Sequence, residues 1–204
     1  MKDVNVLMVG VGGQGVILAS DAMSEIGMNS GYDVKKTDSL GMAQRGGSVV
    51  SHVRWGKHVF SPMVKRGEAD FLIGFEQLEA ARWAQYLKPG GVVIVADVVV
   101  IPVSIIGSNM HYPTWEEIEG ILKQYTGQIY LIPAARIAQE VGNPRAINMV
   151  ILGFLSEFLG VKSEAWTENI RLRLPPKFLE SSLKAFTRGL EEAKAMRLVK
   201  GVKK

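Results

Sequence analysis

Short apolar runs alternate with segments of helical periodicity along most of this chain. The apolar runs, bounded by glycine, proline or polar residues, predict buried strands at residues 5–9, 71–75, 92–96 and 129–132. Between them, apolar positions recur three or four residues apart, which predicts helices at 18–26, 77–87 and 114–124. Strands that alternate with helices are typical of a parallel sheet covered by helices. The pattern therefore predicts an α/β fold with a Rossmann-like, mostly parallel sheet.

The first predicted strand and helix begin a βαβ unit. Gly27 and Gly31 are expected to end the helix, because glycine favours the left-handed conformation in which helices close. Residues 32–37 then predict a second strand, which completes the unit through a right-handed crossover.

A β-hairpin is predicted to interrupt this alternation. Residues 38–48 are polar and glycine-rich, and their length is unusual for a connection inside a domain, so they are a candidate functional loop. The segments 49–55 and 58–62 flank Gly56-Lys57, a two-residue connection that favours a hairpin between them.

The C-terminal part of the chain predicts two long helices. Asn143-Pro144 is typical of the N-cap and first turn of a helix over residues 145–159, which is apolar nearly all round and therefore buried. The helix at 178–196 has one apolar stripe and should pack on the surface or on a partner. No repeat or linker divides the chain, so we expect one domain over residues 1–204 with a helical, basic extension at 175–204.

Composition narrows the chemistry. The chain has 204 residues and no cysteine, which excludes disulfides, a thiol nucleophile and Cys-ligated zinc or iron–sulfur sites from it. The formal net charge of +4 is modest, and no aromatic-lined basic groove indicates a nucleic-acid partner. Neither a secretory signal nor a membrane-spanning segment is expected, so the cytoplasm is the predicted location.

A glycine cluster follows the first strand. Gly10, Gly12, Gly13, Gln14 and Gly15 form a G-x-G-x-x-G motif that opens a helix, where main-chain amides and the helix N-terminus favour an anion such as phosphate. A tight turn without a ligand is an equally good interpretation. Asp38 is the closest candidate for the acidic residue that binds an NAD ribose, so a dinucleotide has little support.

Two further segments are candidates for anion binding. Arg45, Gly46, Gly47 and Ser48 combine a guanidinium, flexible backbone and a hydroxyl, although a solvated turn would have the same composition. A second helix start gathers Asn143, Arg145 and Asn148, for which an ordinary N-cap is the main alternative. An asparagine at 148, within such an apolar helix, is not explained by that alternative. No metal site and no self-sufficient catalytic constellation is predicted.

The order of these motifs resembles the gamma-type subunits of 2-oxoacid:ferredoxin oxidoreductases, which contain the pyruvate/ketoisovalerate oxidoreductase domain. The resemblance extends over about residues 4–195, and the segments that carry it are 9–16, 44–48, 51–54, 68–70 and 142–153. Within this family the chain is most similar to the small (beta) subunits of indolepyruvate ferredoxin oxidoreductases. The pyruvate enzymes usually have a Tyr-Gly-Pro-Glu type of sequence where this chain has Leu40-Gly41-Met42-Ala43-Gln44.

The resemblance implies a division of labour between subunits. A large alpha subunit would carry thiamine diphosphate and [4Fe-4S] clusters, decarboxylate a 2-oxoacid (here an aryl pyruvate), reduce ferredoxin and pass the acyl group to coenzyme A. This chain would help to bind coenzyme A through the glycine cluster and residues 45–48, braced by Asn143, Arg145 and Asn148. Two alternatives stay open: a free-standing NAD- or flavin-binding oxidoreductase, and a structural subunit with no ligand.

Overall fold

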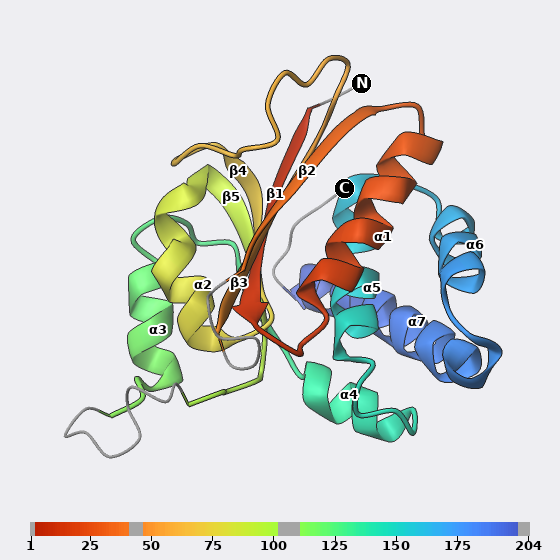
Figure 1. Ribbon diagram of the computed structural model, residues 1–204. Helices are drawn as coiled ribbons and strands as arrows, with labels where there is room; N and C mark the ends of the chain where they lie inside the picture. The colour runs from red at the N-terminus through yellow and green to blue at the C-terminus, as the bar shows by residue number, and fades with distance from the viewer. Residues whose placement is uncertain (1–2, 41–46, 102–110, 200–204) are drawn as a thin grey trace.

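The computed structural model describes residues 3–40, 47–101 and 111–199, which form one six-stranded sheet with helices on both faces (Figure 1). The strands are β1 (Val4–Val11), β2 (Asp33–Leu40), β3 (Ser48–Gly56), β4 (Ala69–Gly74), β5 (Leu87–Ala96) and β6 (Ile129–Ile132). The helices are α1 (Val16–Asn29), α2 (Gln77–Trp83), α3 (Trp115–Leu122), α4 (Ala134–Glu140), α5 (Ile147–Leu159), α6 (Ser163–Arg173) and α7 (Pro176–Val199).

The sheet is mostly parallel, as the sequence predicts. Its order is β2-β3-β1-β4-β5-β6. The neighbours β1, β4, β5 and β6 pair in parallel, whereas β3 pairs antiparallel with both β1 and β2. Helices α1, α4, α5, α6 and α7 cover one face and α2 and α3 the other (Figure 1). The α/β class and the C-terminal helical extension are therefore confirmed.

The second strand does not lie beside the first. β2 pairs only with β3 among the described strands, and β3 separates it from β1, although β1 and β2 run in the same direction. Burial explains this order, because β3 is buried on both of its faces and needs an interior position. The polar, half-exposed β2 is suited to the edge of a sheet.

The hairpin predicted around Gly56-Lys57 is wrong. β3 forms its hairpin with the preceding β2, so residues 38–40 are strand, and residues 58–62 belong to a loop without a strand. A two-residue hairpin turn needs a positive φ at its first central residue. Gly56 has no such φ and instead extends β3, opposite Asp33.

Several helix boundaries also differ from the sequence prediction. Gly27 lies inside α1, where a Cβ atom would come within 2.5 Å of the Trp55 indole nitrogen, so close packing and not chain termination requires glycine there. The helix predicted at 77–87 ends at Trp83, and a 3₁₀ turn precedes Leu87, the first residue of β5. Short α4 and weakly amphipathic α6 were not predicted. The capping box of Thr114 and Glu117 is present at the start of α3.

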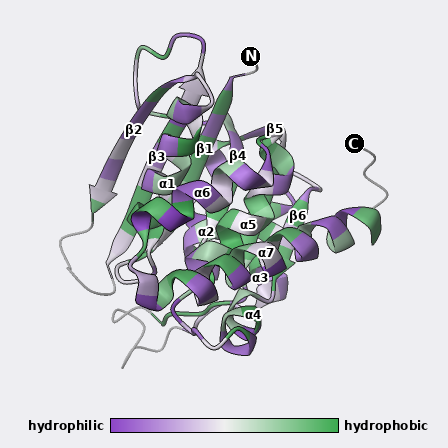
Figure 2. Ribbon diagram, turned by 90° about the vertical axis from the view of Figure 1, so that its right-hand side faces the viewer, coloured by the Kyte–Doolittle hydropathy of each residue, from purple (hydrophilic) through white to green (hydrophobic). Residues whose placement is uncertain are grey.

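Helices α5 and α7 pack unusually closely. α5 is apolar and buried over most of its length and is mostly green in Figure 2. A Cβ atom at Gly153 would lie 2.0 Å from the Phe186 carbonyl oxygen, and one at Gly189 would lie 2.1 Å from the Val150 carbonyl oxygen. The two glycines therefore set the distance between the helices.

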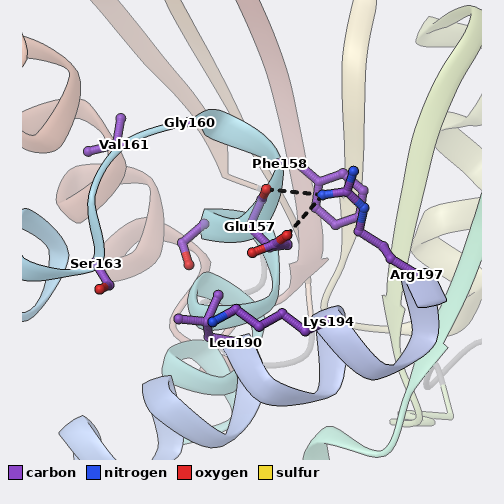
Figure 3. A pocket seen from close by; sticks show the side chains of 9 residues that line it. Glu157, Phe158, Gly160, Val161, Ser163, Leu190, Lys194 and Arg197 are labelled. Carbon is purple, nitrogen blue, oxygen red and sulfur yellow. Dashed lines mark hydrogen bonds and ion pairs between the residues drawn. The ribbon is translucent and has the colours of Figure 1, made fainter. Parts of the chain in front are cut away.

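At the far end of α7, the Arg197 guanidinium binds Glu157 and lies 4.9 Å above the Phe158 ring centroid (Figure 3).

The connection from β3 to β4, residues 57–68 (the β3–β4 loop), rises beyond the sheet at the top of Figure 1. His52 of β3 holds this loop through a hydrogen bond, because its Nδ1 accepts the Val64 N–H at 3.2 Å. Burial lowers the pKa of His52, and the charge of Asp38 opposes this only in part. The ring must be neutral at Nδ1 to accept this hydrogen bond.

We expect Gly189→Ala to lower the free energy of unfolding by at least about 2 kcal/mol, because the methyl group would force α5 and α7 apart. Gly120→Ala is the control, since Gly120 lies on the exposed side of α3 with no atom within 4 Å of an added Cβ. The control should gain up to about 1 kcal/mol from helix propensity. Urea unfolding of both variants measures the difference, and equal behaviour would contradict the packing argument.

Acid should destabilise the protein through His52. Its native pKa is below the unfolded value of about 6.5, so the stabilisation is present above pH 6.5 and is lost as the pH falls through the native pKa. His52→Asn keeps an acceptor near the position of Nδ1 and does not titrate. Urea unfolding at pH 7.5 and pH 5 should therefore show a smaller loss of stability in His52→Asn than in the unaltered protein.

Candidate functional site

The glycine cluster forms the turn between β1 and α1, at the lower end of the sheet in Figure 1. Gly13 and Gly15 have φ angles of +100° and +80°, which other residues rarely adopt. Gly15 is the N-cap of α1 and provides no side-chain cap. In the described part of the chain, the amides of Gly13, Gly15 and residues 16–18 at the start of α1 have no hydrogen-bond partner. They are therefore available as donors at the N-terminus of the helix.

The Gln14 side chain joins the glycine turn to the end of β4. Its Oε1 accepts the Val11 N–H at 2.8 Å, and its Nε2 donates to the Phe75 carbonyl at 2.9 Å. A Cβ at Gly10 would lie 2.7 Å from Gln14 Oε1, so glycine is needed there for this contact. Both ends of the Gln14 amide are thus hydrogen-bonded within the protein and are not available to a ligand. A ligand at the turn would bind the free amides of residues 13 and 15 instead.

The end of the second candidate segment lies against the glycine cluster. Antiparallel pairing of β1 with β3 places Ser48 opposite Val11, and the Gly12 N–H donates to the Gly47 carbonyl at 2.9 Å. The Ser48 hydroxyl donates to Glu79 Oε2 at 2.6 Å. The structure therefore brings Gly47 and Ser48 to the turn but engages both. Arg45 and Gly46 lie outside the described residues.

Asn148 reaches the same turn from α5. Its side chain is 6% exposed, and its Oδ1 accepts the Met149 N–H at 2.9 Å. A Cβ at Gly15 would lie 2.7 Å from Asn148 Nδ2, so this amide nitrogen faces the start of α1. Among the described residues Nδ2 has no hydrogen-bond partner. An amide donor without a partner in the described part of the chain, beside free main-chain amides, is a suitable place for an oxyanion.

Asn143 and Arg145 occupy a turn ahead of α5 and not its N-cap. α5 begins at Ile147 with Ala146 as N-cap, which corrects the predicted start. Asn143 Oδ1 accepts the Arg145 N–H at 3.2 Å, and its Nδ2 donates to Ser181 of α7 at 3.0 Å. Asn143 therefore fastens this turn to α7, while the Arg145 side chain is exposed.

Two buried carboxylates, Glu76 and Glu79, lie near the glycine turn and were not predicted from the sequence. Glu76, 1% exposed, caps α2 through the Glu79 N–H at 2.9 Å, and it also accepts the Val100 N–H at 3.2 Å and the Tyr112 hydroxyl. Burial, and next the hydrogen bond to Glu76, raise the pKa of Tyr112. Glu76 thereby holds Val100 and Tyr112 against the start of α2. Glu76 lies directly between the predicted strand 71–75 and the predicted helix 77–87, and this position was the sequence signal for the cap.

The position of Asp38 disfavours a dinucleotide. In a Rossmann site the ribose-binding acid follows the strand beside β1. Asp38 lies on β2 with β3 in between, and its two oxygens accept from Ser51 at 2.6 Å and Lys36 at 2.7 Å. A ribose would have to displace both partners.

A hollow lies at the other end of α5 from Asn148. It has a volume of about 530 Å³ and is bordered by Glu157, Ser163, Lys194 and Arg197 (Figure 3). Asn148 and Glu157 are separated by about 14 Å along the axis of α5. In this hollow Arg197 is paired with Glu157 at 3.1 Å, whereas Lys194 has no salt-bridge partner in the described part of the chain.

The described residues contain no group of three or more side chains that could together hold a metal ion. None of their helices has the length and hydropathy needed to cross a membrane.

Comparisons with known proteins agree with the motif resemblance. The family profile described as pyruvate ferredoxin/flavodoxin oxidoreductase matches residues 5–192. An indolepyruvate oxidoreductase subunit IorB from Pyrococcus horikoshii is 37% identical over 199 residues, which cover 96% of this chain and 98% of that protein.

Solved structures have the same fold. The gamma subunit of a keto/oxoacid ferredoxin oxidoreductase from Geobacter sulfurreducens aligns with a TM-score of 0.69 and 25% identity, covering 94% of this chain and 99% of that one. A 2-oxoglutarate:ferredoxin oxidoreductase from Magnetococcus marinus, solved with 2-oxoglutarate, coenzyme A and succinyl-CoA, aligns with a TM-score of 0.71 and 21% identity, covering 96% of this chain and 32% of that one. The chain belongs to the pyruvate ferredoxin/flavodoxin oxidoreductase family.

Proposed function

We propose that this chain is the small subunit of a 2-oxoacid:ferredoxin oxidoreductase and that its glycine turn binds a phosphate of coenzyme A. The observation that carries the proposal is the meeting of Asn148 Nδ2 with the uncapped start of α1 at Gly15. Main-chain amides, a side-chain amide and the helix dipole all favour negative charge at that point. Coenzyme A supplies such charge, and the solved relative from Magnetococcus marinus contains it.

The absence of cysteine supports placing the redox centres on another chain. Iron–sulfur clusters in this enzyme class need thiolate ligands, which this sequence lacks. A large subunit would therefore hold the clusters and thiamine diphosphate. The complete reaction releases CO₂ from the 2-oxoacid, transfers the acyl group to the coenzyme A thiol and passes two electrons to ferredoxin. The part of this chain is to hold and orient coenzyme A.

An aryl pyruvate, such as indolepyruvate, is the substrate that we propose for the complex. The support is the Leu40-Gly41-Met42-Ala43-Gln44 segment together with the name of the Pyrococcus relative. Residues 41–44 lie outside the described part of the chain. The substrate side chain would be selected jointly with the large subunit.

A structural role without a ligand is the second candidate. The amides of Val11, Gly12 and Gln14 are already hydrogen-bonded within the protein, so part of the predicted phosphate cradle is occupied by its own neighbours. In that case the turn would serve to hold the start of β3 and the end of β4. Ligand titration separates the two candidates.

Asn148→Ala should weaken coenzyme A binding by the complex about tenfold or more, since a hydrogen bond to a charged group contributes roughly 1.5–3 kcal/mol. Isothermal titration of the complex purified from its native cells measures this. Asn169→Ala is the matched control, because Asn169 is an equally buried amide (4% exposed) that binds Glu25 and belongs to α6. The same affinity in all three proteins would exclude Asn148 from the site and favour the structural role.

Arg45→Ala should also weaken binding about tenfold, because the guanidinium would contact the ligand phosphates. Arg45→Lys retains the charge and should lose less affinity. Titration at low and high salt adds a second readout, since loss of one phosphate contact reduces the salt dependence of binding. An unchanged affinity and salt slope in Arg45→Ala would remove Arg45 from the ligand site.

A further inference from the structure

Phe60 in the β3–β4 loop is 97% exposed, the highest value among the large hydrophobic side chains of the described residues. Met63, on the same loop, is 47% exposed. An isolated exposed apolar residue needs no explanation in itself. A whole phenyl ring held in water by a well-fixed loop is different, because the loop then presents the ring in one place.

The loop is fixed on both sides of Phe60. The Val59 N–H donates to Asp33 at 2.8 Å, and Arg54 Nη1 donates to the carbonyls of Ser61 and Met63, each at 3.2 Å. Val64 is 1% exposed and is held by His52. Because the backbone before and after Phe60 is held by these bonds, little conformational entropy is left to lose when the ring is buried by a partner.

The charge of the loop is complementary to an acidic surface. Its exposed charged side chains are Lys57, Lys65 and Arg66, and the one carboxylate of the loop, Glu68, is partly buried. The neighbouring Asp33 is already engaged with Lys35, and Asp70 with Lys88. These three cations have no salt-bridge partner in the described part of the chain. A loop that carries them together with an exposed phenyl ring is suited to a protein surface with an apolar pocket and carboxylates at its rim.

We propose that the β3–β4 loop docks onto the large subunit of the complex, with Phe60 inserted into an apolar pocket rimmed by carboxylates. The identity of this partner rests on the proposed function. A second copy of this chain is a poorer occupant, because a symmetric contact through the loop would place Lys57, Lys65 and Arg66 against the same cations.

The docking site and the glycine turn lie at opposite ends of the sheet. The pairing of β1 with β3 sets Val4 opposite Trp55 at the loop end and Val11 opposite Ser48 at the turn. At roughly 3.3 Å per residue, the length of β1 separates them by about 23 Å. A partner seated on the loop therefore leaves the turn open, and a large subunit that reaches both must extend along the sheet.

The test is assembly of the two subunits. Purified small subunit is passed over immobilised large subunit, and the dissociation constant is measured for the unaltered chain, Phe60→Ser and the pair Lys65→Glu with Arg66→Glu. Phe60→Ser should bind at least about tenfold more weakly. The charge-reversed pair should associate more slowly, with a flatter salt dependence. Leu172→Ser is the control, because Leu172 is 77% exposed on α6 and should bind normally.

The outcomes separate this proposal from the proposed function. If the unaltered chain does not bind the large subunit, the proposed function fails. If it binds and Phe60→Ser binds equally well, the docking proposal is overturned while the subunit role stands. Self-association of the unaltered chain, or retained RNA, that is lost in Phe60→Ser would also overturn the proposal, since it would identify a different occupant. Circular dichroism should show Phe60→Ser folded, because the bonds that hold the loop come from other residues.

Discussion

The antiparallel insertion of β3 between β1 and β2 is the constraint on which the rest of this structure depends. Its eight residue pairs with β1 bring Gly47 and Ser48 to the glycine turn at one end. At the other end they place the β3–β4 loop beside the start of β1. Both regions to which we assign a role are therefore positioned by the same ladder of main-chain hydrogen bonds, and a change of register in β3 would displace both.

The fold class could be predicted from the sequence because the four parallel strands are short, continuous apolar runs separated by helical periodicity. The position of β2 in the sheet could not be predicted, because periodicity identifies a single strand and does not indicate which strand lies beside it. The misplaced hairpin has the same origin: Gly56-Lys57 has the composition of a turn, but the choice between two partners for β3 depended on burial across the sheet. Local sequence predicts a helix end at Gly27, because its contact with Trp55 of a distant strand is not visible in the chain around it.

The candidate site was predictable in outline and not in detail. The glycine spacing indicates the turn, and Asn148, which an ordinary N-cap does not explain, lies beside Gly15 in the structure. The roles of Gln14 and Ser48 were not visible, because each depends on a partner more than 30 positions away, Phe75 and Glu79. Local motifs thus indicated which donors were available, and tertiary contacts decided which of them remained free.

The edge strand β2 has a consequence for how this protein assembles. Lys36 lies between Asp21 and Asp38 at 2.6 and 2.7 Å, and Lys35 is paired with Asp33, so charged side chains occupy much of that strand. A foreign strand that tried to add to β2 would have to desolvate these ion pairs, which is a common natural protection against edge-to-edge aggregation. The protein can thus expose the Phe60 ring elsewhere on its surface while the β2 edge of its sheet is protected against pairing with a strand of another molecule.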